Sequence, residues 1–108
     1  MTFFLKQNDT APSIRASLKD GSNSAVDLTS ASVKFHMKTV FGNTTKINAS
    51  ANIISPETNG VVQYNWTSND TNTPGTFFGE FEVTHSDGTV ETFPNNSFIT
   101  VEVTEDIT

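Results

Sequence analysis

The chain has 108 residues and 34% hydrophobic content, which suits one compact domain with a single core. It contains no cysteine, which excludes disulfide scaffolds, thiol catalysis and cysteine-ligated metal sites. Six basic against twelve acidic residues give a net charge of −6, which argues against partners such as nucleic acid or an anionic membrane surface.

Small uncharged polar residues are unusually frequent in this sequence. There are 17 Thr, 11 Ser and 11 Asn, together 39 of the 108 residues. Their side chains compete for the backbone inside helices, whereas Thr is favoured in strands and Asn and Ser are favoured in turns. No segment carries apolar residues at helical spacing over about eleven positions. The composition therefore predicts an all-β protein.

The first half of the chain contains alternating and weakly patterned segments. Residues 13–18 alternate apolar with polar side chains and end at a turn, and residues 26–28 form a short extended piece. In residues 32–38, alternate apolar side chains predict a strand with one buried face, and residues 46–54 show only weak alternation. The chain ends, including residues 1–2 and 104–108, are expected to fray or to order on a partner.

The second half carries the clearest strand signals. Residues 61–66 alternate and point Trp66 inward, and residues 76–93 are expected to form a hairpin around a tight turn at 86–89. The last strand is expected at 98–104. About seven to nine short strands, with turn signals about every ten residues, predict an antiparallel β-sandwich of two sheets spanning residues 1–108 as a single domain.

Residue types that could support catalysis or metal binding are scattered in this pattern. His36 and His85 lie on different predicted strands without a third histidine or a cysteine, and no Gly-x-Ser-x-Gly motif occurs. Outward carboxylates at Glu80, Glu82, Glu91 and Glu102 are typical of a solvated face, with Lys34 and Lys38 as partners if the strands adjoin. We expect no catalytic residue, no metal and no cofactor.

The aromatic residues divide into expected core and expected interface. The inward phase of their strands assigns four of them to the core: Phe35, Trp66, Phe77 and Phe81. Four others lie out of phase or beside turns and ends, and are candidates for a protein interface: Phe3, Phe4, Phe78 and Phe93. Alternatively, Phe3 and Phe4 plug one end of the sandwich.

Three stretches carry a family resemblance: residues 64–71 (YNWTSNDT), 75–83 (GTFFGEFEV) and 87–94 (DGTVETFP). With residues 4–12 and 26–37, they resemble the immunoglobulin-like domain at the N-terminus of phage baseplate upper proteins and related tail-associated proteins. The resemblance implies that Trp66 is the core aromatic, and that Asp70, Gly75 and Phe77 form the corner between two strands. No tyrosine follows Gly75 to tie that corner.

The resemblance implies a non-enzymatic bacteriophage virion protein. It would dock by protein–protein contacts onto the tail, baseplate or neck, in multiple copies or as a homo-oligomer in a symmetric assembly. The first residues lack the features of a signal peptide, so synthesis in the host cytoplasm is expected. Two alternatives are a capsid-attached decoration protein and a carbohydrate-binding host-adhesion module with Trp66 or Phe78 as its sugar platform. A hydrolase is the third hypothesis, without a motif to support it.

Overall fold

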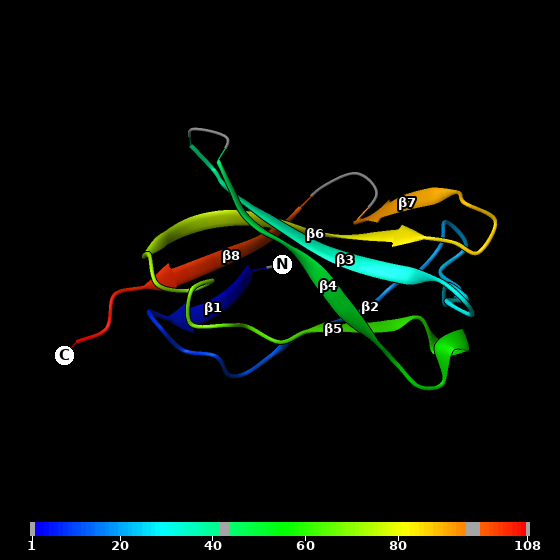
Figure 1. Cartoon of the computed structure of the whole chain (residues 1–108), viewed down its shortest axis with the longest axis horizontal. Coiled ribbons are helices and arrows are strands. Elements are labelled where there is room, and N and C mark those ends of the chain that lie inside the picture. Colours follow the sequence, from blue (N-terminus) through cyan, green and yellow to red (C-terminus); the bar gives the residue numbers. More distant parts are fainter. Residues whose placement is uncertain (1, 42–43, 95–97, 108) are drawn as a thin grey trace.

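A computed structural model describes residues 2–41, 44–94 and 98–107 of the chain, shown in Figure 1. Its elements are β1 (Thr2–Lys6), β2 (Ile14–Ser17), β3 (Ser32–Thr39), β4 (Thr45–Ile54), the short 3-10 helix η1 (Glu57–Asn59), β5 (Val61–Tyr64), β6 (Gly75–Thr84), β7 (Val90–Phe93) and β8 (Ile99–Thr104). Within these ranges there is no α-helix, and none of the described residues forms a helix that could cross a membrane. The all-β prediction is confirmed.

The strands form one connected sheet in the order β1-β8-β6-β3-β4-β5-β2, with β7 also paired to β6. β4 belongs to both halves, because residues 45–51 pair with β3 and residues 52–54 pair with β5. We call β1, β8, β6, β7, β3 and the first part of β4 the larger sheet, and the rest of β4 with β5 and β2 the smaller sheet. Together they curl into a nearly closed, barrel-like arrangement (Figure 1).

Three segments differ from the sequence-based expectation. The chain's beginning forms β1, which runs parallel to β8, so the predicted purely antiparallel pairing is wrong at this edge. Residues 45–54 form a ten-residue strand. Their apolar alternation is weak because the strand passes from one sheet to the other. Residues 26–28 are not a strand, although Val26 and Leu28 are buried there, in a loop held partly by backbone hydrogen bonds.

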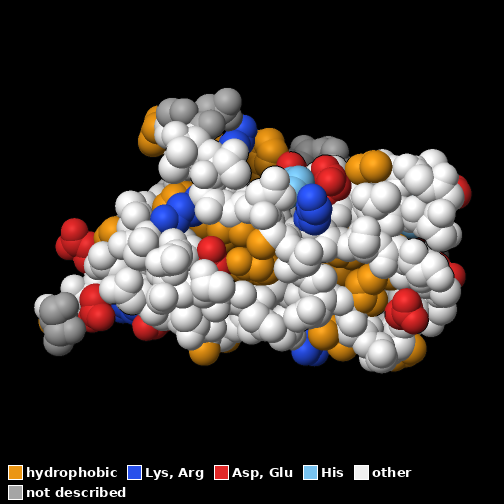
Figure 2. Space-filling model, viewed as in Figure 1, with side chains coloured by type: hydrophobic (Ala, Val, Ile, Leu, Met, Phe, Trp, Pro, Cys, Tyr) orange, Lys and Arg blue, Asp and Glu red, His pale blue; other side chains and the backbone are white. Residues whose placement is uncertain are grey.

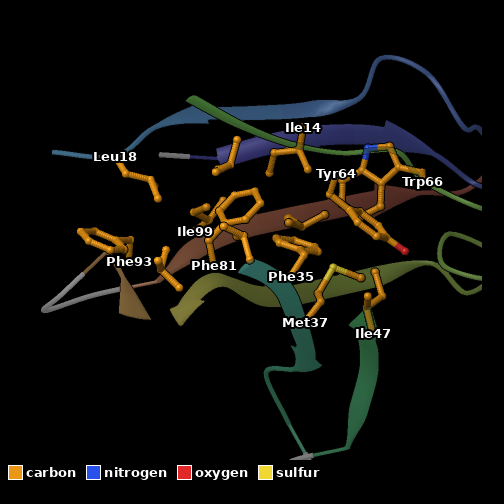
Figure 3. Packing of buried hydrophobic residues seen from close by; sticks show 14 of the residues in the cluster. Ile14, Leu18, Phe35, Met37, Ile47, Tyr64, Trp66, Phe81, Phe93 and Ile99 are labelled. Atoms are coloured by element: carbon orange, nitrogen blue, oxygen red, sulfur yellow. The ribbon is translucent and has the colours of Figure 1, made fainter. Parts of the chain in front are cut away.

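The core lies between the two sheets, as Figure 3 shows. Phe35 and Phe81 of the larger sheet are fully buried, with ring centroids 4.9 Å apart. From the smaller-sheet side, Tyr64 stacks on Phe35 at 5.0 Å and Trp66 meets the same ring edge-on at 5.7 Å. Offset and edge-on contacts are the arrangements that aromatic quadrupoles favour, so Phe35 joins the two halves of the core.

The loop between β5 and β6 is closed by a tyrosine that precedes it. The hydroxyl of Tyr64 donates to Oδ2 of Asp70 at 2.6 Å, and the same oxygen accepts the backbone N–H of Thr67 at 2.8 Å. Burial and this hydrogen bond raise the pKa of Tyr64 well above its ordinary value. The expectation that no tyrosine ties this corner is therefore wrong, because the hydroxyl comes from the strand before the loop.

The same loop also holds the segment that follows β1. The Thr71 hydroxyl donates to the carbonyl of Asp9 at 2.9 Å, and the backbone N–H of Asn8 donates to the carbonyl of Thr71 at 2.9 Å. The indole N–H of Trp66 donates to the Pro12 carbonyl at 3.1 Å. Buried polar groups in this loop thus find partners in the β1–β2 connection, which fixes β1 at the sheet edge.

The predicted hairpin between residues 76 and 93 is confirmed as β6 and β7. Its turn is closed by the His85 backbone N–H donating to the Thr89 carbonyl at 2.8 Å, and Gly88 adopts a positive φ of 90°. The hydroxyl and the amide N–H of Thr89 both donate to Asp87, which lowers the pKa of that carboxyl. The Asp-Gly-Thr sequence therefore specifies this turn locally.

Candidate functional site: the outer face of the larger sheet

The outer face of β6 carries an aromatic side chain among carboxylates. Odd positions such as Phe77 and Phe81 point into the core, so Phe78 and Glu80 point outward. Phe78 is half-buried, because a second aromatic ring covers one side of it. Its ring stacks on that of Phe98, with centroids 4.9 Å apart and planes 19° from parallel.

Phe98 was not among the predicted interface residues. It lies one position before β8, its side chain is 47% exposed, and it occupies the outward phase of the strand that follows. The alternation of residues 98–104 contained this signal, since Ile99 and Val101 point inward. Its stacking on Phe78 depends on the pairing of β8 with β6, where Phe78 lies opposite Thr100.

A shallow hollow of about 250 Å³ opens beside this aromatic pair. Its lining residues come from β3, β4, β6 and the position just before β8: His36, Met37, Lys38, Thr45, Asn48, Phe78, Glu80 and Phe98. The pairing of β3 with β4 shifts register between Met37 and Lys38. Such an irregularity increases local twist and redirects side chains, and both residues at this shift line the hollow.

The two adjacent phenylalanines of β1 separate in the structure. Phe3 points inward and packs on Trp66 with ring centroids 5.9 Å apart, whereas Phe4 is 67% exposed. Phe4 lies opposite Glu102 of β8, which in turn lies opposite Thr76 of β6, so all three share the outer face with Phe78. Phe3 thus covers the core next to Trp66, and Phe4 lies exposed on the outer face.

Two other aromatic candidates lie in the core. Phe93 is only 4% exposed, because its register opposite Phe81 points it inward, so the interface role predicted for Phe93 is wrong. Trp66 is 4% exposed and its N–H is bonded to Pro12, which removes it as a sugar platform. Phe35, Phe77 and Phe81 lie in the core, Asp70 at the corner, and Gly75 begins β6 with a φ of 151°.

Basic side chains of β3 lie opposite acidic side chains of β6 on the outer face. The register places Lys34 opposite Glu82 and His36 opposite Glu80, because β3 and β6 are neighbours. Figure 2 shows basic, acidic, histidine and hydrophobic side chains gathered over this part of the molecule. At the far end of β6, His85 Nε2 lies 2.9 Å from Glu91 Oε1. In the described ranges, no three His, Cys, Asp or Glu residues gather in a way that could hold a metal ion.

The outer face of the smaller sheet carries polar side chains that hydrogen-bond one another. Arg15 donates to the side-chain carbonyl of Gln63 from Nε and Nη2 at 2.9 and 2.6 Å, and Gln63 donates to Asn65 at 2.8 Å. Ser13 also donates to Asn65, at 2.7 Å. These side chains satisfy one another, and no large exposed hydrophobic residue of the described chain lies on β2 or β5.

Comparison with known protein families shows to which family the chain belongs. The family model of the BppU N-terminal domain matches residues 4–107, nearly the whole chain. The chain belongs to the BppU N-terminal domain family. Among curated proteins, none matches it.

As a BppU N-terminal domain, the protein is a component of the phage baseplate. The family is that of the baseplate upper protein, a structural component of the tail, and is generally non-enzymatic. A BppU N-terminal domain therefore assembles with other phage structural proteins in the virion.

Proposed function

We propose that this BppU N-terminal domain docks onto other baseplate proteins through the outer face of its larger sheet, without catalytic activity. The observation that carries the proposal is the asymmetry of the two outer faces. Phe4, Phe98 and Val90 are exposed on the larger sheet, whereas the smaller sheet presents side chains that already bond one another. Exposed apolar side chains on one face favour it as an interaction surface, and aromatic side chains are common anchors of interfaces.

The edge of the larger sheet offers a second means of contact. β1 is the outermost strand, and Phe4 projects from it onto the proposed docking face. A partner strand added beside β1 would extend the sheet and lie next to Phe4. Strand addition combines backbone hydrogen bonds with side-chain pockets, so β1 and the outer face would form one continuous interface.

We also propose that residues 1–108 form a single domain of immunoglobulin-like type, in which β4 is shared by both sheets. One hydrophobic cluster spanning both sheets supports the single domain. Membership of a baseplate family favours docking in the baseplate over the neck or the capsid. Symmetric assembly would bring several copies into each particle, with the same face used by each copy.

The proposal is tested by incorporation of variants into particles. Phage carrying Phe4→Ala together with Phe98→Ala would be purified, and the protein quantified in virions by mass spectrometry. Loss of interface anchors worth about 2 kcal/mol predicts roughly thirtyfold weaker docking. Arg15→Ala, on the other face, is the matched control and should incorporate normally.

Two results would contradict the proposal. Equal incorporation of the double variant and the control would remove the outer face as the docking surface. Absence of the unaltered protein from purified particles would remove the virion role altogether. Circular dichroism of each purified variant separates loss of docking from loss of folding.

A further inference from the structure

We propose that the hollow beside Phe78 and Phe98 is a binding site for one neutral sugar ring in its pyranose form. This goes beyond docking, since it assigns a small-molecule ligand class to a defined depression of about 250 Å³. That volume lies just below the roughly 300–1,000 Å³ of typical ligand pockets, so it suits a single ring rather than a long chain. The inference rests on three properties of the hollow: an apolar wall, mixed polar groups and balanced charge.

The apolar wall is formed by the Phe78–Phe98 pair. The two rings lie nearly parallel at 4.9 Å, so each supports the other in one orientation, and Phe98 keeps about half of its surface exposed. A pyranose presents a flat patch of C–H groups on one face, which packs on an aromatic ring. A preformed pair of rings offers that surface without first ordering a side chain.

The remaining lining residues supply both donors and acceptors. Asn48 and Thr45 can each donate and accept, Glu80 accepts, and His36 offers a ring nitrogen of either kind. Sugar hydroxyls likewise donate and accept at once. An apolar side chain inserted into the hollow itself would leave these polar groups without hydrogen bonds, so the hollow favours a polar occupant even though Phe98 at its rim belongs to the proposed docking face.

Charge favours a neutral ligand. Lys38 and Glu80 line the same hollow and carry opposite charges. The hollow therefore attracts neither a phosphate nor a cationic side chain strongly, because one of the two residues would repel it. The chain's net charge of −6 further disfavours nucleic acid and other polyanions. Ring hydroxyls, which carry no net charge, match this lining.

The test is a titration of the whole chain, followed by two-dimensional amide NMR, with methyl glycosides of glucose, galactose, N-acetylglucosamine and rhamnose. At least one glycoside should shift signals of residues lining the hollow, with an affinity of about millimolar, as expected for a single ring. Open-chain sorbitol carries similar hydroxyls without a rigid C–H face, and should cause no such shifts.

Three variants locate the site. Phe98→Ala and Asn48→Ala should each weaken binding at least about tenfold, whereas Phe41→Ala, which removes another exposed ring outside the hollow, should bind normally. Unchanged spectra with every glycoside would overturn the proposal, as would binding that survives Phe98→Ala. Loss of virion incorporation in Phe98→Ala with no sugar binding by the unaltered chain would overturn it as well, and would leave docking as the role of this residue.

Discussion

Gly79 occupies the inward position of β6 directly beneath a core ring. A Cβ placed there would lie 2.9 Å from Cζ of Phe35, closer than packed atoms tolerate. The position thus requires glycine for space rather than for backbone conformation. The ring it admits is the one that Tyr64, Trp66 and Phe81 all contact.

Gly79→Ala should therefore lower the free energy of unfolding by about 1–3 kcal/mol through overpacking. Chemical denaturation followed by circular dichroism measures the change. Gly21→Ala is the matched control, because a Cβ at Gly21 meets no atom within 4 Å. Equal stability of the two variants would mean that Phe35 moves aside at no cost.

Tyr64 makes stability depend on alkaline pH. Its pKa is raised in the folded chain, whereas in the unfolded chain it lies near about 10. Below that pH, Tyr64 is protonated in both the folded and the unfolded state, and its contribution to the free energy of unfolding is complete. Above it, the unfolded state binds fewer protons than the folded state, so the free energy of unfolding falls as pH rises.

Tyr64 is the one tyrosine of the sequence, so tyrosinate absorbance reports on it directly. Absorbance should stay low above pH of about 10 until the chain unfolds. The Tyr64→Phe variant should lack this component of alkaline destabilisation. Tyrosinate absorbance that develops near its ordinary pKa in a folded chain would contradict the buried Tyr64–Asp70 hydrogen bond.

At the scale of elements, β1 places two neighbouring phenylalanines on opposite faces. Phe3→Ala should destabilise the fold by about 1–3 kcal/mol, because it uncovers part of the core and the Trp66 ring. Phe4→Ala should change stability by less than about 0.5 kcal/mol, since the side chain is exposed. Thermal unfolding with Trp66 fluorescence as the probe distinguishes them, and a larger effect at Phe4 would reverse the assigned register.

Alternation in the sequence was sufficient to predict β3, β5, the β6–β7 hairpin and β8, because each of these strands keeps one face in the core. It could not predict β1, whose consecutive apolar residues 3–5 show no alternation. Nor could it predict the full length of β4, since Asn48, Ser50 and Asn52 alternate only with small half-buried alanines where the strand changes sheets.

The candidate site was predictable in part. Phe4 and Phe78 were identified from phase and position, and Phe98 has the same outward phase as its strand. Phe93 was misassigned because proximity to a turn outweighed its register opposite Phe81. The hollow could not be predicted from the sequence, because its lining residues come together only through the pairing of β3, β4 and β6 and a ring contact between β6 and the residue before β8.

At the scale of the whole molecule, the two sheets share one core through Phe35. Unfolding should therefore be a single cooperative transition. Trp66 fluorescence, which reports on the smaller-sheet side, and far-ultraviolet circular dichroism, which reports on all strands, should give coincident denaturation curves. An earlier loss of the Trp66 signal would show that the smaller sheet opens by itself.

The parallel pairing of β1 with β8 also determines how the molecule responds to force. Thr2 lies opposite Thr100 and Lys6 opposite Thr104, so a pull that separates Thr2 from Thr104 slides one strand along the other. The hydrogen bonds between them are then loaded in shear, all at once, instead of being unzipped one after another. Bonds loaded together in this way resist separation along the strand direction more strongly than bonds that are broken one at a time.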